Sequence, residues 1–118
     1  MKILIIEPDE YYHHQFARTF ENLAEIVVAK SGARALAYLR DERPDALIME
    51  LLLADQSGYE FLHSLAELEM PIDFPIIVYS RLDRPEDIKT SLGLGVQDYF
   101  VKGRDHISEI KKLLTSKS

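Results

Sequence analysis

Four polar side chains stand at the ends of apolar segments in this chain of 118 residues, namely Glu7, Glu50, Ser80 and Lys102. Each closes or follows a short run of β-branched and other apolar residues, which is typical of a buried strand. A carboxylate at the end of a buried strand is costly unless it is paired, and Lys102 is the evident counter-charge for Glu50. In a parallel α/β sheet, ligands bind beyond the carboxyl ends of the strands. We therefore expect one polar rim that combines carboxylates, a hydroxyl and an ammonium.

Further acids follow the first of these segments. Pro8 suits the first turn of a helix, and Asp9 and Glu10 suit the positive end of a helix dipole. Helix capping is therefore the favoured interpretation of these two acids. The helix itself is predicted from apolar residues at spacings of four, four and three, namely Tyr12, Phe16, Phe20 and Leu23.

Five apolar segments alternate with five segments of helical periodicity. The strands are expected at residues 3–6, 25–29, 45–50, 75–80 and 97–101. Ser57 and Glu60 fit a capping box before the third helix, and residues 115–118 are expected to be frayed. Because the strands are continuously apolar, the sheet should be parallel and covered on both faces. We predict a single α/β domain over residues 1–118. It is a three-layer, doubly wound fold with a five-stranded parallel sheet in the flavodoxin-like order 2-1-3-4-5.

Composition excludes several classes of function. The chain is long enough for one domain and has no cysteine, so we expect no disulfide and no thiolate metal site. The formal net charge of -6 argues against direct nucleic-acid binding by this domain. No apolar run approaches a membrane span, and the acidic start does not resemble a signal peptide. The expected location is cytoplasmic.

At this point the sequence resembles the receiver domains of two-component response regulators. The resemblance rests on four segments in the right order: KILIIEPDE, RPDALIMELLLADQSG, PIIVYS and GVQDYFVKG. In that family an acidic pair after the first strand binds Mg²⁺, and an aspartate after the third strand accepts a phosphoryl group from a histidine kinase. A hydroxyl and a lysine hold the phosphoryl oxygens, and an aromatic residue then turns inward. By position, the resemblance assigns these roles to Glu7 with Pro8, Glu50, Ser80, Lys102 and Tyr99.

The chain departs from the family pattern at the positions that carry the chemistry. Glu50 replaces the aspartate, which moves the carboxylate outward by roughly 1.5 Å. A misplacement of about 1 Å can cost on the order of 10²-fold in the rate of a positioned reaction. Pro8 replaces one acid of the metal-binding pair, so Mg²⁺ binding by Glu7 and Glu50 is expected to be weakened. Glu7, Asp9 or Glu10 can substitute for the missing acid in part. We therefore predict a pseudo-receiver that requires no cofactor.

Three further departures surround the site. Ala54 and Gly103 stand where the family usually has prolines, and Arg81 follows the switch hydroxyl in place of a small residue. Arg81 is a candidate to fill the space that the phosphoryl group would occupy or to contact an anion, with a solvated loop arginine as the equal alternative. A longer carboxylate at position 50 is also expected to form a standing ion pair with Lys102, which would resemble a fixed, partly activated state.

The expected function is that of a protein-interaction module and not of an enzyme. The resemblance implies a partner on the face built from the fourth helix, the fifth strand and the fifth helix. That partner would be a histidine kinase, an output domain or a second copy of the chain. The residues expected on this face are Asp87, Lys89, Tyr99, Arg104 and Lys111, although a charged helical face is more often merely solvated.

Two alternatives stay open. One is a receiver that is phosphorylated after all, at Glu50 or at Asp55 in the following loop. The other is a flavodoxin-like domain that binds a small ligand, although the acidic segment EPDEYY would repel phosphate there. A hydrolase is poorly supported, because no aspartate nucleophile ends a strand. The four histidines are expected to be exposed and to form no metal site.

Overall fold

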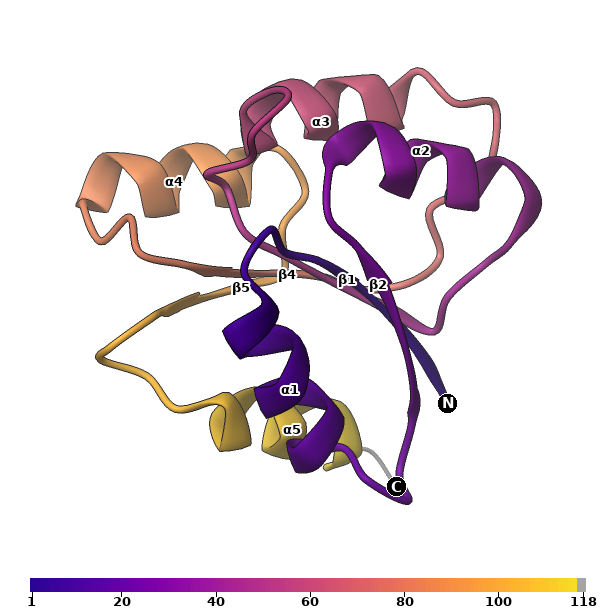
Figure 1. Ribbon diagram of the computed structural model, residues 1–118. Helices are drawn as coiled ribbons and strands as arrows, with labels where there is room; N and C mark the ends of the chain where they lie inside the picture. The colour runs from indigo at the N-terminus through magenta and orange to yellow at the C-terminus, as the bar shows by residue number, and fades with distance from the viewer. Residues whose placement is uncertain (117–118) are drawn as a thin grey trace.

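The computed structural model describes residues 1–116 and consists of a central sheet with helices on both faces (Figure 1). All strand pairs are parallel, and the order across the sheet is β2-β1-β3-β4-β5. The strands are β1 (Lys2–Ile6), β2 (Glu25–Ala29), β3 (Ala46–Met49), β4 (Ile76–Ser80) and β5 (Asp98–Val101). Both the predicted fold class and the predicted strand order are confirmed.

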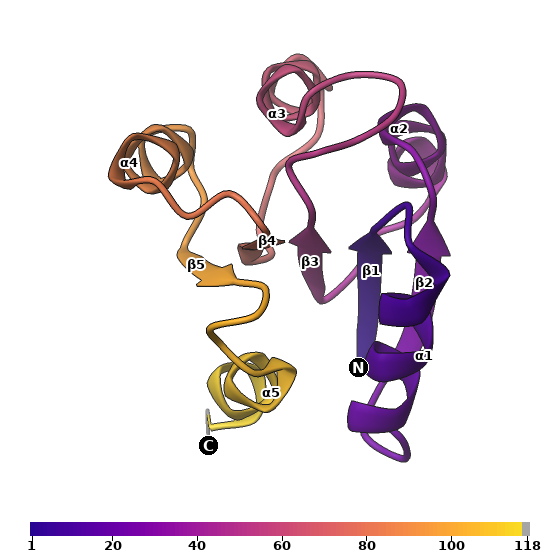
Figure 2. The same ribbon diagram turned by 60° about the vertical axis from the view of Figure 1, so that its left-hand side comes forward.

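Helices form the two outer layers of the fold. They are α1 (Glu10–Thr19), α2 (Gly32–Asp41), α3 (Gly58–Ala66), α4 (Pro85–Gly93) and α5 (Ile107–Thr115). Figures 1 and 2 show α2, α3 and α4 over one face of the sheet and α1 with α5 over the other. Within residues 1–116, no helix has the length and apolar character that crossing a membrane requires.

The core consists of two clusters, one on each face of the sheet. Successive strand residues point to opposite faces, so each apolar strand supplies both clusters. On β1, Leu4 and Ile6 pack under α2 and α3, whereas Ile3 and Ile5 pack against α1 and α5. The strands that carry the polar rim are therefore buried on both sides, which fixes the positions of their carboxyl ends.

The first helix differs from its prediction at both ends. It begins at Glu10 and not at Pro8, because Asp9 is its N-cap and accepts a hydrogen bond from the backbone N–H of Tyr11. The capping interpretation of Asp9 is thus confirmed. Leu23 lies beyond the helix in an exposed turn, so its place on the helix face was wrong.

The later helices follow the predicted signals more closely. The capping box is confirmed, since the hydroxyl of Ser57 accepts from the Glu60 N–H and the Glu60 carboxylate accepts from the Ser57 N–H. At the other end of the chain, Thr115 is still helical and donates a hydrogen bond to the Lys111 carbonyl, contrary to the predicted fraying. Residues 117–118, which the same prediction included, lie outside the described part of the chain.

Candidate functional site

The four polar residues at the strand ends come together on one rim of the sheet. Glu7 follows β1, Glu50 follows β3, Ser80 ends β4 and Lys102 follows β5. All four are buried, and they come from segments up to 95 positions apart. The expectation of a shared polar rim is confirmed in its geometry.

Lys102 lies between two carboxylates. Its Nζ donates hydrogen bonds to Glu7 Oε1 at 2.6 Å and to Glu50 Oε1 at 2.7 Å. The exposed fractions of the Lys102 side chain and of each carboxylate partner are only 3% and 4%. Burial raises the pKa of Glu7, and the contact with Lys102 opposes that rise. The expected standing ion pair of Glu50 and Lys102 is present, with Glu7 as a second partner.

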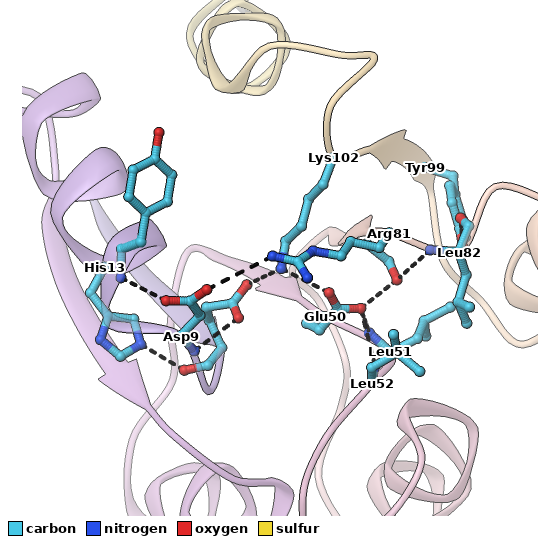
Figure 3. Close-up of polar contacts among 12 residues, drawn as sticks. Asp9, His13, Glu50, Leu51, Leu52, Arg81, Leu82, Tyr99 and Lys102 are labelled. Carbon is cyan, nitrogen blue, oxygen red and sulfur yellow. Dashed lines mark hydrogen bonds and ion pairs between the residues drawn. The ribbon is translucent and has the colours of Figure 1, made fainter.

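The second oxygen of Glu50 is enclosed by donors. Glu50 Oε2 accepts from the backbone N–H of Leu51 at 2.6 Å and from that of Leu52 at 3.0 Å, and it also accepts from the hydroxyl of Ser80 (Figure 3). A carboxylate oxygen that accepts several hydrogen bonds is held in one orientation. Both oxygens of Glu50 are therefore engaged by groups of its own chain.

A continuous chain of hydrogen bonds leads from Glu50 to Tyr99 (Figure 3). Ser80 donates to Glu50, and its hydroxyl oxygen accepts from the N–H of Leu82 at 3.2 Å. The carbonyl of Leu82 in turn accepts from the hydroxyl of Tyr99 at 2.6 Å. Tyr99 is 8% exposed, and burial raises its pKa to about 12. The side chain of Tyr99 is thus turned inward, and its hydroxyl is hydrogen-bonded to the loop that follows Ser80.

The carboxylates do not fit a Mg²⁺ ion as they are arranged. Mg²⁺ requires near-octahedral oxygen ligands, but each oxygen of Glu7 and Glu50 already accepts a hydrogen bond. The ammonium of Lys102 supplies the positive charge between them, and Pro8 offers no side-chain oxygen. Across residues 1–116, no group of three or more histidine or acidic side chains is placed to hold a metal ion.

Arg81 lies at the mouth of the site and not inside it. Its guanidinium is 4.0 Å from the carboxylate of Asp9, and its side chain is 66% exposed. Both residues line a shallow hollow of about 160 Å³ that also reaches Glu50 and Lys102. Arg81 therefore does not fill the space beside Glu50, which the donors of the chain itself enclose.

The carboxylate of Asp55 is bound by backbone donors at the start of α2. Its two carboxylate oxygens accept from the backbone N–H groups of Gly32 at 3.1 Å and Ala33 at 3.0 Å, at the start of α2. These bonds, that to Ala33 foremost, lower the pKa of Asp55. Asp55 thus ties the loop after β3 to the start of α2.

One histidine was placed wrongly. His13 is half-buried, and its Nε2 lies 2.6 Å from the carbonyl oxygen of Glu7, within hydrogen-bond distance. His14 and His63 are exposed as expected, and His106 is the exposed N-cap of α5.

Asp87 also departs from its prediction, because it is buried and not on an exposed partner face. It is 9% exposed, and its Oδ1 accepts from the hydroxyl of Tyr59 on α3 at 2.7 Å. Its Oδ2 lies 3.6 Å from Arg84 Nε in an ion pair, but within the described residues neither this oxygen nor the buried hydroxyl of Ser91 has a hydrogen-bond partner. Asp87 therefore joins α4 to α3, while Lys89 and Arg104 remain exposed.

Replacing Tyr59 by phenylalanine should destabilise the protein. The Tyr59→Phe variant leaves the buried carboxylate of Asp87 without its tyrosine donor, so we expect the free energy of unfolding to fall by about 1–3 kcal/mol. Urea denaturation followed by circular dichroism measures this change. Tyr11→Phe, which alters an exposed tyrosine, is the matched control and should change stability by less than about 0.5 kcal/mol. Equal stability of both variants would show that the Tyr59 contact contributes nothing.

The parallel sheet, its strand order and the rim beyond the strand ends define an α/β domain of the flavodoxin-like class. The family model of the response regulator receiver domain matches residues 3–114, and the chain belongs to this family. Receiver domains are modules of two-component signalling, so the chain is a receiver domain of that system.

Known relatives and solved structures agree with this assignment. The probable transcriptional regulatory protein TcrX of Mycobacterium tuberculosis is 35% identical over 77 residues, which are 65% of this chain and 32% of TcrX. The phosphate regulon transcriptional regulatory protein PhoB of Pseudomonas aeruginosa is 26% identical over 95% of this chain and 51% of its own. The chain thus spans about a third of TcrX and half of PhoB. The crystal structure of a two-component response regulator from Clostridium difficile has the same fold, with a TM-score of 0.88, 20% identity, and coverage of 98% of this chain and 93% of that one.

Proposed function

We propose that this receiver domain works without phosphorylation and that Glu50 takes the place of a phosphorylated aspartate. In the family, the switch hydroxyl and the lysine hold the oxygens of the phosphoryl group. Here Ser80 and Lys102 both contact the carboxylate of Glu50 instead. This shared contact is the observation that carries the proposal.

The same arrangement disfavours phosphoryl transfer to Glu50. An attacking carboxylate oxygen must be free and in line with the phosphorus atom, because this reaction depends on positioning and on charge stabilisation. Glu50 Oε1 is paired with Lys102, and Glu50 Oε2 accepts three hydrogen bonds. Attack would first require these contacts to break. The domain in this proposal needs no Mg²⁺, since the ammonium of Lys102 already supplies a positive charge between the two acids.

The inward position of Tyr99 fits a domain held in its signalling arrangement. The hydrogen bonds from Glu50 through Ser80 and Leu82 end at the Tyr99 hydroxyl, so the carboxylate is linked to β5. A partner would then recognise the face of α4, β5 and α5 at all times. Exposed Lys89 and Arg104 remain available on it.

The partner in this proposal is a protein, namely a histidine kinase, an output domain or a second copy of the chain, and the location is cytoplasmic. TcrX and PhoB are transcriptional regulators by name, and both are longer than this chain. An output domain on a longer parent protein is therefore a natural partner. The domain itself catalyses no reaction and binds no nucleic acid in this proposal.

The decisive experiment is exposure to a phosphodonor. The protein is incubated with acetyl phosphate and Mg²⁺, and its intact mass is measured over time. We expect no added phosphoryl group, because both oxygens of Glu50 are engaged. Added phosphoryl mass that disappears in the Glu50→Gln variant would overturn the proposal and favour the alternative of a phosphorylated receiver.

A further inference from the structure

The ammonium of Lys102 has a third neighbour besides its two carboxylates. A lysine ammonium carries three N–H donors, and two of them go to Glu7 and Glu50. Among residues 1–116, no oxygen accepts the third. Instead the Nζ atom lies 4.1 Å from the centroid of the Tyr12 ring, within the range of a cation–π contact.

The ring of Tyr12 is itself held firmly. Tyr12 packs edge-to-face on Tyr79, with ring centroids 5.7 Å apart and an interplanar angle of 87°. Tyr79 packs in the same way on Phe16, also at 5.7 Å. Tyr79 and Phe16 are buried in the core cluster between the sheet and α1. The Tyr12 ring that contacts the ammonium is thus held in place by its packing on the core.

Desolvation makes this contact matter. A buried ammonium loses its water, and a cation–π contact is strongest where both partners are desolvated. Lys102 is almost fully buried, so each of its neighbours helps to compensate the lost hydration. Tyr79 also faces the ammonium, but its centroid is 5.7 Å away, and its contact is therefore weaker.

We propose that Tyr12 is a positioning residue, whose ring holds the Lys102 ammonium between Glu7 and Glu50. This inference rests on the proposed function, because Lys102 supplies the positive charge of the site and holds Glu50 in the place of a phosphorylated aspartate only while it stays in position. It gives α1 a role in the site, because Tyr12 lies on this helix and contacts the ammonium in addition to the two carboxylates. If the cation–π contact is weakened, Lys102 should leave its position between the two carboxylates for a larger fraction of the time.

A series of near-isosteric rings at position 12 separates the electrostatic contact from packing. Tyr12→Phe keeps the aromatic face, and phenylalanines with one, two and three ring fluorines at this position weaken it stepwise with little change of shape. The measured quantity is the rate at which acetic anhydride acetylates Lys102, read by peptide mass spectrometry. Exposed Lys112 in the same protein serves as the internal reference.

We expect Tyr12→Phe to leave the Lys102 rate within about twofold, and the trifluorinated ring to raise it by about two- to thirtyfold, with a stepwise increase between them. The same fluorinated rings at position 79 should have a smaller effect. A flat rate across the series at position 12, with folding unchanged, would overturn the proposal, since packing alone would then explain the contact.

The phosphodonor experiment and the fluorinated series can fail separately, so their results distinguish the two proposals. If the wild-type protein accepts a phosphoryl group on Glu50 but the fluorinated series shows its gradient, the proposed function fails and the role of Tyr12 stands. If the protein resists phosphorylation and the series is flat, the role of Tyr12 fails and the proposed function stands.

Discussion

The Lys102→Ala variant should lose about 3–5 kcal/mol of its free energy of unfolding at neutral pH, because removing one member of a buried ion cluster leaves uncompensated charge. Glu7 and Glu50 would both remain in the rim, each with a side chain only 4% exposed. Urea denaturation followed by circular dichroism gives the size of the loss. It is the largest stability effect that we expect from a single substitution in this domain.

The loss should shrink as the pH falls. Burial already raises the pKa of Glu7, and Lys102 is the group that opposes the rise. Without the lysine, that pKa rises further above the ordinary value of 4.5. A carboxyl group whose pKa is raised by folding destabilises the native state as the pH increases through that pKa. The variant should therefore be closest to the wild-type protein at acidic pH and furthest from it at neutral pH.

Two controls define the origin of this effect. Lys89→Ala removes an exposed lysine and should change stability by less than about 0.5 kcal/mol. A triple variant, Lys102→Met with Glu7→Gln and Glu50→Gln, removes every charge of the cluster and should recover much of the loss. If Lys102→Ala were no more destabilising than Lys89→Ala, the ion cluster would not hold the rim together.

The sequence predicts the sheet and the polar rim well for a common reason. Continuous apolar strands indicate a parallel sheet, and parallel strands carry their terminal residues to one edge. The positions of Glu7, Glu50, Ser80 and Lys102 follow directly from that rule. The start of α1 was predicted at Pro8 from a local signal alone. The structure places it at Glu10, because Asp9 is the N-cap of the helix.

The contacts that the sequence does not predict join distant residues. Asp87 has the spacing and the charge of an exposed helix residue, but it is buried and accepts a hydrogen bond from Tyr59, 28 positions earlier. Tyr12 was correctly placed on an apolar helix face, but its contact with Lys102 spans 90 positions. Helical periodicity identifies the inward face of a helix but not which polar group meets it.

The double variant Glu50→Asp with Pro8→Asp should gain the ability to accept a phosphoryl group from acetyl phosphate and Mg²⁺. The shorter side chain withdraws the carboxylate by roughly 1.5 Å from the donors of Leu51, Leu52 and Ser80. Those donors then become available to phosphoryl oxygens. The new acid at position 8 restores a second anionic ligand for Mg²⁺. Intact mass should show one added phosphoryl group.

The expected gain in rate over the wild-type protein is on the order of 10²-fold or more, since a displacement of about 1 Å in a positioned reaction has that effect. The single variants are the matched controls. Glu50→Asp alone corrects the reach of the carboxylate but not the metal site, and Pro8→Asp alone corrects the metal site but leaves Glu50 enclosed. Each should therefore gain less than the double variant. If the double variant accepted no more phosphoryl group than the wild-type protein, neither the length of the side chain at position 50 nor the missing acid at position 8 would be what prevents phosphorylation. The contact between Tyr12 and Lys102 would then be the next one to remove.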